Sequence, residues 1–312
     1  PVAKVQINTA KAKSAGRRKC FWLAEANRIG VFREMLKDAA GLAHSFLYRL
    51  RGSSMSWPWP VRRGNVAPMQ PEEYRKMAGV EDRMWYYRAL HRHVLRSLRS
   101  NLPAATVPRV LDAGCGTGGL LCRLQEAEPA WRLAGLDFSP LACDLARKRT
   151  GLDIAQGSIT AMPFMDASFD AVVSCDVVCQ VTDAAGALRE FHRCLRPAGI
   201  VVLTMPAYQW MYSYHDREVA NLRRYNRGEV NALLREAGFA IKRSTHWNMF
   251  PFPLAVVRRK IFPPRTPDSD VRLFPAPVEL AFNGLIAVEH GWLRAGCQLP
   301  FGNSVLTVAQ KP

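Results

Sequence analysis

"RVLDAGCGTGGLL", residues 109–121, runs from apolar residues through an acid into four glycines within six positions, and then into apolar residues again. The apolar run before the glycines predicts a strand, and the residues after them predict a helix. Glycines let backbone amides approach a ligand closely, and the first turn of a helix leaves N–H groups unpaired. The stretch therefore predicts a strand–loop–helix cradle for a cofactor.

Strand and helix patterns alternate on both sides of this cradle. Such alternation, with nearly continuous apolar strands, is typical of a parallel sheet covered by helices on both faces. We expect an α/β fold, a doubly wound and mostly parallel seven-stranded sheet whose last strand is antiparallel. The predicted strands are 109–114, 132–137, 152–157, 169–175, 199–206, 239–247 and 304–311, and the helices between them are 118–127, 139–149, 183–195 and 227–238.

The front of the chain differs in composition from the rest. Residues 1–108 carry 20 Lys and Arg against 7 Asp and Glu, so most of the net charge of +17 lies there. We divide the chain into a basic N-terminal extension, residues 1–70, and a folded domain, residues 71–312. The extension is expected to hold a disordered start, an amphipathic helix at 21–50 and a Pro-rich linker at 52–71, and residues 71–100 are expected to form one long helix.

Targeting signals and metal motifs are not evident. The start lacks the apolar block of a secretory signal, and no run of residues is long and apolar enough to predict a membrane span. The eight cysteines contain no CxxC pair, so we expect reduced thiols, no metal and a cytoplasmic protein. The basic extension favours peripheral contact with an anionic membrane surface, and a solvated tail is the alternative.

Two acids accompany the glycines. Asp112 precedes them, and Asp137 ends the next predicted strand, where a carboxylate meets ribose hydroxyls in doubly wound sheets. Nicotinamide-binding loops place a pyrophosphate over the helix. Asp112 would repel a pyrophosphate, but it would accept hydrogen bonds from an ammonium group.

At these residues the chain resembles the class I S-adenosylmethionine-dependent methyltransferases, in the branch with a type-11-like domain. VLDAGCGTGG (110–119) is similar to the first motif of the family, and LAGLDFSP (133–140) to the second. Residues 157–178 resemble the third and fourth motifs, and residues 187–206 the helix and strand that follow. The resemblance covers most of residues 71–312.

The resemblance implies S-adenosylmethionine as the cofactor. The loop glycines and Asp112 would surround its methionine part, and Asp137 would bind the ribose. Phe138 would flank the adenine, and the backbone near Cys175 would face the sulfonium. The expected cofactor-binding residues are Asp112, Gly114, Cys115, Gly116, Gly118, Asp137, Phe138, Ser158, Ile159 and Cys175.

Two positions depart from the family pattern. Ser158 stands where relatives have an acid that bonds the adenine amino group, and Gln180 stands where relatives often have a His. A hydroxyl still accepts the first bond, although more weakly than a carboxylate. Any base function of that His is not reproduced at Gln180.

The segment PAYQWMYSYHDREVANLRRYN (206–226) follows the fifth strand and resembles an "HD…RRY" signature of this branch. Its position at the carboxyl end of a strand favours substrate contact. We expect His215 to act as general base with Asp216 or a neighbouring residue orienting it, and Arg224 to hold an anionic group. A structural network that closes a lid is the alternative. The candidate catalytic residues are His215, Asp216 and Tyr225, and the candidate substrate-binding residues are Tyr87, Tyr208, Tyr212 and Arg224.

Residues 248–300 contain two apolar, Pro-flanked helical patterns between the last two strands. Such an insertion predicts a lid, and its apolar content favours a hydrophobic or lipid-like acceptor; packing over the sheet or a dimer face is the alternative. The expected function is transfer of a methyl group from S-adenosylmethionine to a small-molecule or lipid-like acceptor. RNA or protein methylation, nicotinamide-dependent redox chemistry and non-catalytic cofactor binding remain alternatives, although no RNA-binding signature is present.

Overall fold

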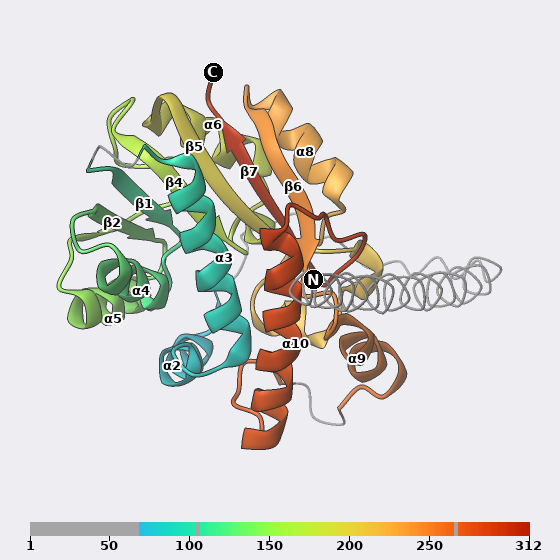
Figure 1. Ribbon diagram of the computed structural model, residues 1–312. Helices are drawn as coiled ribbons and strands as arrows, with labels where there is room; N and C mark the ends of the chain where they lie inside the picture. The colour runs from blue at the N-terminus through green and yellow to red at the C-terminus, as the bar shows by residue number, and fades with distance from the viewer. Residues whose placement is uncertain (1–68, 104–106, 265–267) are drawn as a thin grey trace, which may run out of the picture. The chain divides into compact units, whose positions relative to one another are not determined.

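The computed structural model describes residues 69–103, 107–264 and 268–312. In this part of the chain seven strands form one sheet in the order β3-β2-β1-β4-β5-β7-β6 (Figure 1). Strands β1 to β5 pair in parallel, and β7 is antiparallel to both β5 and β6. The predicted fold class is confirmed. The strands are β1 (Arg109–Ala113), β2 (Arg132–Asp137), β3 (Ile154–Gln156), β4 (Phe169–Cys175), β5 (Leu195–Pro206), β6 (Ala240–Trp247) and β7 (Ser304–Gln310).

Helices cover both faces of this sheet. The longer ones are α2 (Pro71–Val80), α3 (Trp85–Asn101), α4 (Gly119–Ala127), α5 (Pro140–Thr150), α6 (Ala184–Cys194), α8 (Arg227–Glu236) and α10 (Ala276–Arg294). The short ones are α7 (Tyr214–Glu218), α9 (Phe252–Val256), the 3₁₀ turns η1 (Val178–Gln180) and η2 (Gln209–Met211), and the π-helical turn η3 (Val257–Ile261). Among the described residues, no helix is both long and apolar enough to cross a membrane.

The period-two pattern of the strands divides the core between the two faces. Val172 and Val201 belong to the cluster that packs against α6 and α8. Their neighbours Val173 and Val202 belong to the cluster that packs against α3, α4 and α10. The continuous apolar runs of β4 and β5 therefore reflect burial on both sides, as the sequence predicted.

The prediction of one helix over residues 71–100 is wrong in one respect. The structure has two helices there, separated by a turn at 81–84. Glu81 in that turn is buried, and its carboxylate accepts a hydrogen bond from the Thr117 hydroxyl and pairs with Arg149. A buried carboxylate needs such partners. The chain therefore leaves the helical path where Glu81 reaches the glycine loop.

The predicted insertion between the last two strands consists of α9, η3 and α10. The α10 helix lies along α3, with the Trp85 and Phe282 rings 4.7 Å apart and the His93 and His290 rings stacked at 4.0 Å. Glu289 of α10 is fully buried and accepts hydrogen bonds from the backbone amides of Asn248 and Met249, at 2.5 and 2.7 Å. One carboxylate thus fixes the exit of β6 to the insertion.

The predicted N-terminal extension lies outside the described residues except at its last two positions, so that domain division stays a prediction.

Replacing Glu289 by Ala tests this attachment. The change leaves two buried N–H groups without their acceptor, so we expect the free energy of unfolding to fall by about 2–4 kcal/mol in urea denaturation. Glu126→Ala, at an exposed ion pair with Arg123 on α4, is the control and should change it by less than about 0.5 kcal/mol. Equal effects of the two substitutions would contradict the anchoring role.

Candidate active site

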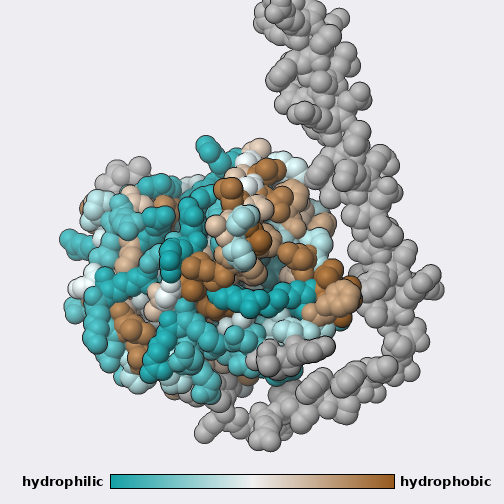
Figure 2. All heavy atoms as spheres, turned by 90° about the horizontal axis from the view of Figure 1, so that it is seen from below, coloured by the Kyte–Doolittle hydropathy of each residue, from teal (hydrophilic) through white to brown (hydrophobic). Residues whose placement is uncertain are grey.

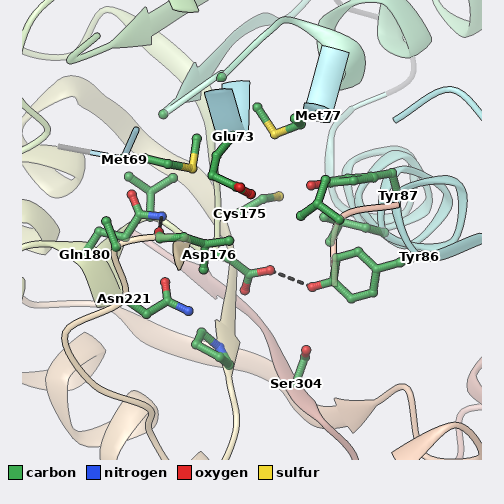
Figure 3. A pocket seen from close by; sticks show the side chains of 18 of the residues that line it. Met69, Glu73, Met77, Tyr86, Tyr87, Cys175, Asp176, Gln180, Asn221 and Ser304 are labelled. Carbon is green, nitrogen blue, oxygen red and sulfur yellow. Dashed lines mark hydrogen bonds between the residues drawn. The ribbon is translucent and has the colours of Figure 1, made fainter. Parts of the chain in front are cut away.

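A cavity of about 800 Å³ lies at the carboxyl ends of β1, β2, β4 and β5. This is the position expected for a ligand in such a sheet, because β1 is paired with β2 on one side and β4 on the other. The glycine loop, α2, the start of α3 and the insertion complete its walls. Figure 3 shows Met69, Glu73 and Met77 gathered at one end, with Tyr86, Asp176 and Ser304 at the other.

The glycine loop takes a backbone path that favours glycine. Gly116 has φ +53°, and a Cβ there would come within 2.7 Å of the Met77 methyl group. Gly118 has φ +87° and faces the Ala146 backbone of α5, so it packs two helices together and does not line the cavity. Gly114, Cys115 and Gly116 do line it, as the sequence predicted.

Asp137 links the loops after β1 and β2. Its carboxylate accepts hydrogen bonds from the backbone amides of Gly116 and Ser139, both at 2.9 Å. Ser139 in turn caps the start of α5. Burial raises the pKa of Asp137, and the backbone hydrogen bonds oppose that rise. The side chain lines the cavity, so it stays in contact with whatever fills this end.

Asp112 lies deeper in the same end of the cavity. Burial, together with the nearby Asp137 and Glu81 carboxylates, raises the pKa of Asp112 to about 8. A cationic group bound beside these acids would stabilise their charged forms, whereas an anionic group would be repelled. The electrostatics of this end favour a positively charged ligand.

The remaining predicted cofactor residues also lie on the cavity wall. Phe138 lines it while its ring stays 64% exposed, so one aromatic face is open to a planar group. Ser158 and Ile159 follow β3, and Cys175 ends β4. The Ser158 hydroxyl shares a hydrogen bond of 2.8 Å with Thr160.

Asp176, which the sequence analysis did not select, marks the other end of the cavity. Its carboxylate accepts hydrogen bonds from the Tyr86 hydroxyl at 2.7 Å and from the Thr204 hydroxyl at 3.2 Å (Figure 3). Its backbone has φ +58°, a strained conformation that persists only where the surroundings enforce it. Burial raises the pKa of Asp176. A clue was present in the sequence, since this acid directly follows a predicted strand.

Tyr87, the predicted substrate contact on α3, lines the cavity next to Tyr86, with the two rings 5.6 Å apart. Burial raises the pKa of the Tyr87 phenol, so the group is neutral and able to donate a hydrogen bond. The structure therefore brings Tyr87, selected from the sequence as a substrate contact, to the cavity wall.

The structure does not pair His215 with Asp216 as expected. Asp216 is fully buried and binds the Arg224 side chain at 2.8 Å, and it also accepts from Asn221. His215 lines the cavity, but its Nδ1 accepts a hydrogen bond from the Asp270 amide at 3.1 Å. Burial and Arg259 lower the pKa of His215 to about 3, so the neutral ring carries its proton on Nε2 and is a hydrogen-bond donor there.

Arg224 reaches the cavity wall with its charge already neutralised. Besides Asp216, it donates to the Ala207 carbonyl at 3.1 Å and to Asn303 at 3.3 Å. These bonds hold segment 206–226 against the end of β5. The arrangement corresponds to the alternative interpretation, a structural network, and not to an anion clamp.

Three predicted site tyrosines lie away from the cavity lining. Tyr208 stacks on His246 and shares a hydrogen bond of 3.2 Å with it. Tyr212 donates to the Asn221 carbonyl, and Tyr225 is buried beneath the Arg223 guanidinium. The many aromatic residues of segment 206–226 therefore serve its packing, because each of these three rings contacts other protein groups.

Asp270 connects the insertion to segment 206–226. It accepts hydrogen bonds from Arg258 at 3.0 Å, Arg259 at 2.9 Å and Tyr214 at 3.2 Å. The two guanidinium groups and His215 lower the pKa of Asp270 to about 2 despite its partial burial. One wall of the cavity is therefore an ion-pair network of two cations and one acid.

Comparison with known proteins finds a family model that matches the middle of the chain. Residues 111–203 match the family model described as a methyltransferase domain. The chain is 33% identical over 172 residues to a malonyl-[acyl-carrier protein] O-methyltransferase of Dechloromonas aromatica, covering 52% of this chain and 64% of that one. It is 32% identical over 112 residues to a demethylmenaquinone methyltransferase of Chlorobaculum tepidum, covering 36% and 46%. The chain thus spans less than two thirds of the length of these relatives.

Solved structures agree on the fold. A methyltransferase bound to the Trm112 activator of Haloferax volcanii superposes with a TM-score of 0.54 at 22% identity, over 80% of this chain and 98% of that one. The [4+2]-cyclase SpnF superposes with a TM-score of 0.51 at 17% identity, over the same shares. Since the second protein is named for a cyclisation, the fold alone does not fix the reaction.

S-adenosylmethionine is the cofactor that the matched methyltransferase domain implies, and the residues present fit it. The acidic end suits its two cationic groups, Asp137 lies where a ribose would be bound, and the open face of Phe138 suits a purine. The glycine at position 116 leaves the room that a Cβ would fill.

Asp112→Asn tests the electrostatics of this end. Because the pKa of Asp112 is raised in the folded protein, the folded state binds more protons than the unfolded state between about pH 4 and about pH 8, and stability falls as the pH rises through that range. The variant lacks this titration. We expect the loss of unfolding free energy between about pH 5 and about pH 8, measured with urea, to shrink by on the order of 1–3 kcal/mol.

Asp144→Asn, at an exposed ion pair on α5, is the matched control and should keep the wild-type pH dependence. An unchanged pH dependence in the Asp112 variant would show that this carboxyl titrates normally.

Proposed function

We propose that the chain, which carries a class I S-adenosylmethionine-dependent methyltransferase domain, transfers a methyl group to a small hydrophobic or lipid-like acceptor. The observation that carries the proposal is a single cavity with two chemically different ends. The acidic end fits the methyl donor. The other end offers Asp176 and Tyr86 within an aromatic and aliphatic wall that suits the acceptor.

The donor end is proposed to use this chain's residues as follows. Asp137 would bind the ribose hydroxyls, Phe138 would stack on the adenine, and Asp112 would face the ammonium group. Bound there, the cofactor supplies an electrophilic methyl group on a positively charged sulfur. Cys175 ends β4, and Asp176 is the next residue, so the donor region and the acceptor region meet at this point of the chain.

The acceptor end is proposed to prepare the nucleophile. An acceptor hydroxyl or amine carries a proton that must leave as its lone pair forms the new bond to carbon. The Asp176 carboxylate would take that proton at Oδ2, while Tyr86, which stays neutral because burial raises its pKa, holds the carboxylate in place. His215, with its low pKa, would serve as a hydrogen-bond donor to the acceptor.

A hydrophobic acceptor is supported by the composition of the walls. Apolar side chains from three parts of the chain line the cavity: α3 with the residue before it, α9, and the first turns of α10 with the residues before them. The side chains are Met84, Leu90, Leu254, Ala255, Phe274 and Phe282. Two relatives are named for methyl transfer to malonyl-[acyl-carrier protein] and to demethylmenaquinone, and the second name denotes a small-molecule acceptor.

Asp137→Ala tests the donor end. The loss of a charge-assisted partner should weaken S-adenosylmethionine binding by about 1.5–3 kcal/mol, measured by isothermal titration calorimetry. Asp153→Ala, at an exposed position before β3, is the control and should leave the affinity unchanged. Wild-type affinity in the Asp137 variant would refute the ribose role, and binding of NADH in place of S-adenosylmethionine would refute the proposed function.

Asp176→Asn tests the acceptor end. Labelled methyl transfer into lipid and metabolite extracts of the source cell, with mass identification of the product, first supplies the acceptor. With that acceptor the variant should lower kcat by about 100-fold or more, because a positioned base contributes that much, and should leave calorimetric affinity for S-adenosylmethionine intact.

The pH profile separates a base from a structural group. Wild-type kcat should rise as the Asp176 carboxyl loses its proton, and the variant should lack that inflection. Asp166→Asn, on the exposed loop at the opposite end of β4, should behave as wild type. An unaltered profile in the Asp176 variant would remove this residue from the chemistry.

A further inference from the structure

The solvent-facing side of α10 is apolar along the central turns of the helix. Among residues 280–291, the exposed positions are occupied by Leu, Ala, Gly and Val alone. Leu280 is 74% exposed, and Leu285 and Val288 lie further along on the same side. Single exposed apolar residues are ordinary, but a helix face without any charge is not.

A second apolar stripe runs along α9 and η3. Leu254, Val257 and Ile261 recur at helical spacing and are exposed, and Phe262 directly after them is 73% exposed. We call these residues, together with the outward face of α10, the lid surface. Figure 1 places α9 and the first turns of α10 at the end of the molecule where the strands have their carboxyl ends.

The lid surface is continuous with the cavity. Leu254 lines the cavity and is 54% exposed, so one side chain belongs to both. Phe274 and Phe282, which flank the start of α10, also line the cavity. Figure 2, which views this end of the molecule, shows hydrophobic side chains gathered around a hollow. An apolar molecule could pass from the lid surface to Asp176 along apolar contacts.

Exposed cations lie beside this surface. Of the three cations in residues 254–262, LAVVRRKIF, Arg258 and Arg259 pair with Asp270, whereas Lys260 is exposed and donates to the Tyr212 carbonyl. Arg272 lies near the start of α10, with its guanidinium over the Phe274 ring. A second copy of the same surface would bring like charges together, which opposes self-association. An anionic bilayer offers both an apolar interior and complementary charge.

We propose that the lid surface docks onto an anionic lipid bilayer, with α9, η3 and α10 in the interface and the cavity mouth facing the membrane. The inference rests on the proposed function in one respect, because it names the acceptor class as a molecule dissolved in the bilayer. Docking itself requires only the exposed apolar stripes and the cations beside them.

Vesicle sedimentation with the full chain tests docking. Vesicles of equal parts phosphatidylcholine and phosphatidylglycerol should bind the protein, and the double variant Phe262→Asp/Leu280→Asp should bind about tenfold more weakly or worse, since two large apolar side chains no longer enter the interface. Met165→Asp is the matched control, because Met165 is 82% exposed on the loop before β4, at the opposite end of the sheet. It should bind as wild type does.

A local probe separates the lid surface from any contribution of residues 1–68. An environment-sensitive fluorophore is attached at Leu280→Cys or Met165→Cys, in a chain whose Cys20 and Cys297 are serine. Vesicles should shift the emission to the blue at position 280 only. Equal binding by the double variant, or no shift at position 280, would overturn the proposal.

Two further measurements keep the interpretations apart. A dimer in sedimentation velocity that the double variant abolishes, without vesicle binding, would assign the surface to a second copy and overturn docking. Calorimetric affinity for S-adenosylmethionine should be the same in all variants. If docking is lost and methyl transfer is retained, the proposed function still holds and the docking proposal fails. If the protein docks but transfers no methyl group, the docking proposal still holds and the proposed function fails.

Discussion

The hydrogen bond from the Gly116 amide to the Asp137 carboxylate is the contact on which the site depends. It joins the loops after two neighbouring strands, and Ser139 extends it to the first turn of α5. Glu81 adds a second connection, because it holds Thr117 of the same loop and Arg149 at the far end of α5. The helices before the sheet, the glycine loop and α5 are thereby fixed as one wall. Without that wall, the two ends of the cavity would not share a single space.

The same contacts concentrate negative charge in a chain whose net charge is +17. Burial raises the pKa values of Asp112 and Asp137, which means that their charged forms are unfavourable until a cation binds beside them. A pyrophosphate would add to the repulsion between these negative charges, whereas a sulfonium and an ammonium group would reduce it. The wall thus selects its ligand by charge as well as by shape, and this argues for a methyl donor over a dinucleotide.

The sequence predicted the sheet and the donor end well because both depend on local signals. Apolar runs and glycines determine where β1, β2 and the cradle lie, and the structure reproduces the predicted range of β4 to the residue. The break after α2 was missed because it arises from a partner, Arg149, that is distant in sequence. The cluster in 206–226 misled for a related reason. Its polar residues face one another, as in the Asp216–Arg224 pair. The sequence pattern does not reveal whether a polar side chain binds another protein group or a ligand.

Asp176 shows why the acceptor end was harder to find. A left-handed backbone conformation and a partly buried acid both cost stability. Gly or Asn would avoid the first cost, and most residues would avoid the second. The hydrogen bonds from Tyr86 and Thr204 offset part of this cost in stability. A Gly at this position would need neither hydrogen bond. Stability therefore does not account for an aspartate at this point. The proposed proton transfer beside the end of β4 would account for it, because an acceptor held between the apolar walls would lie against this carboxylate.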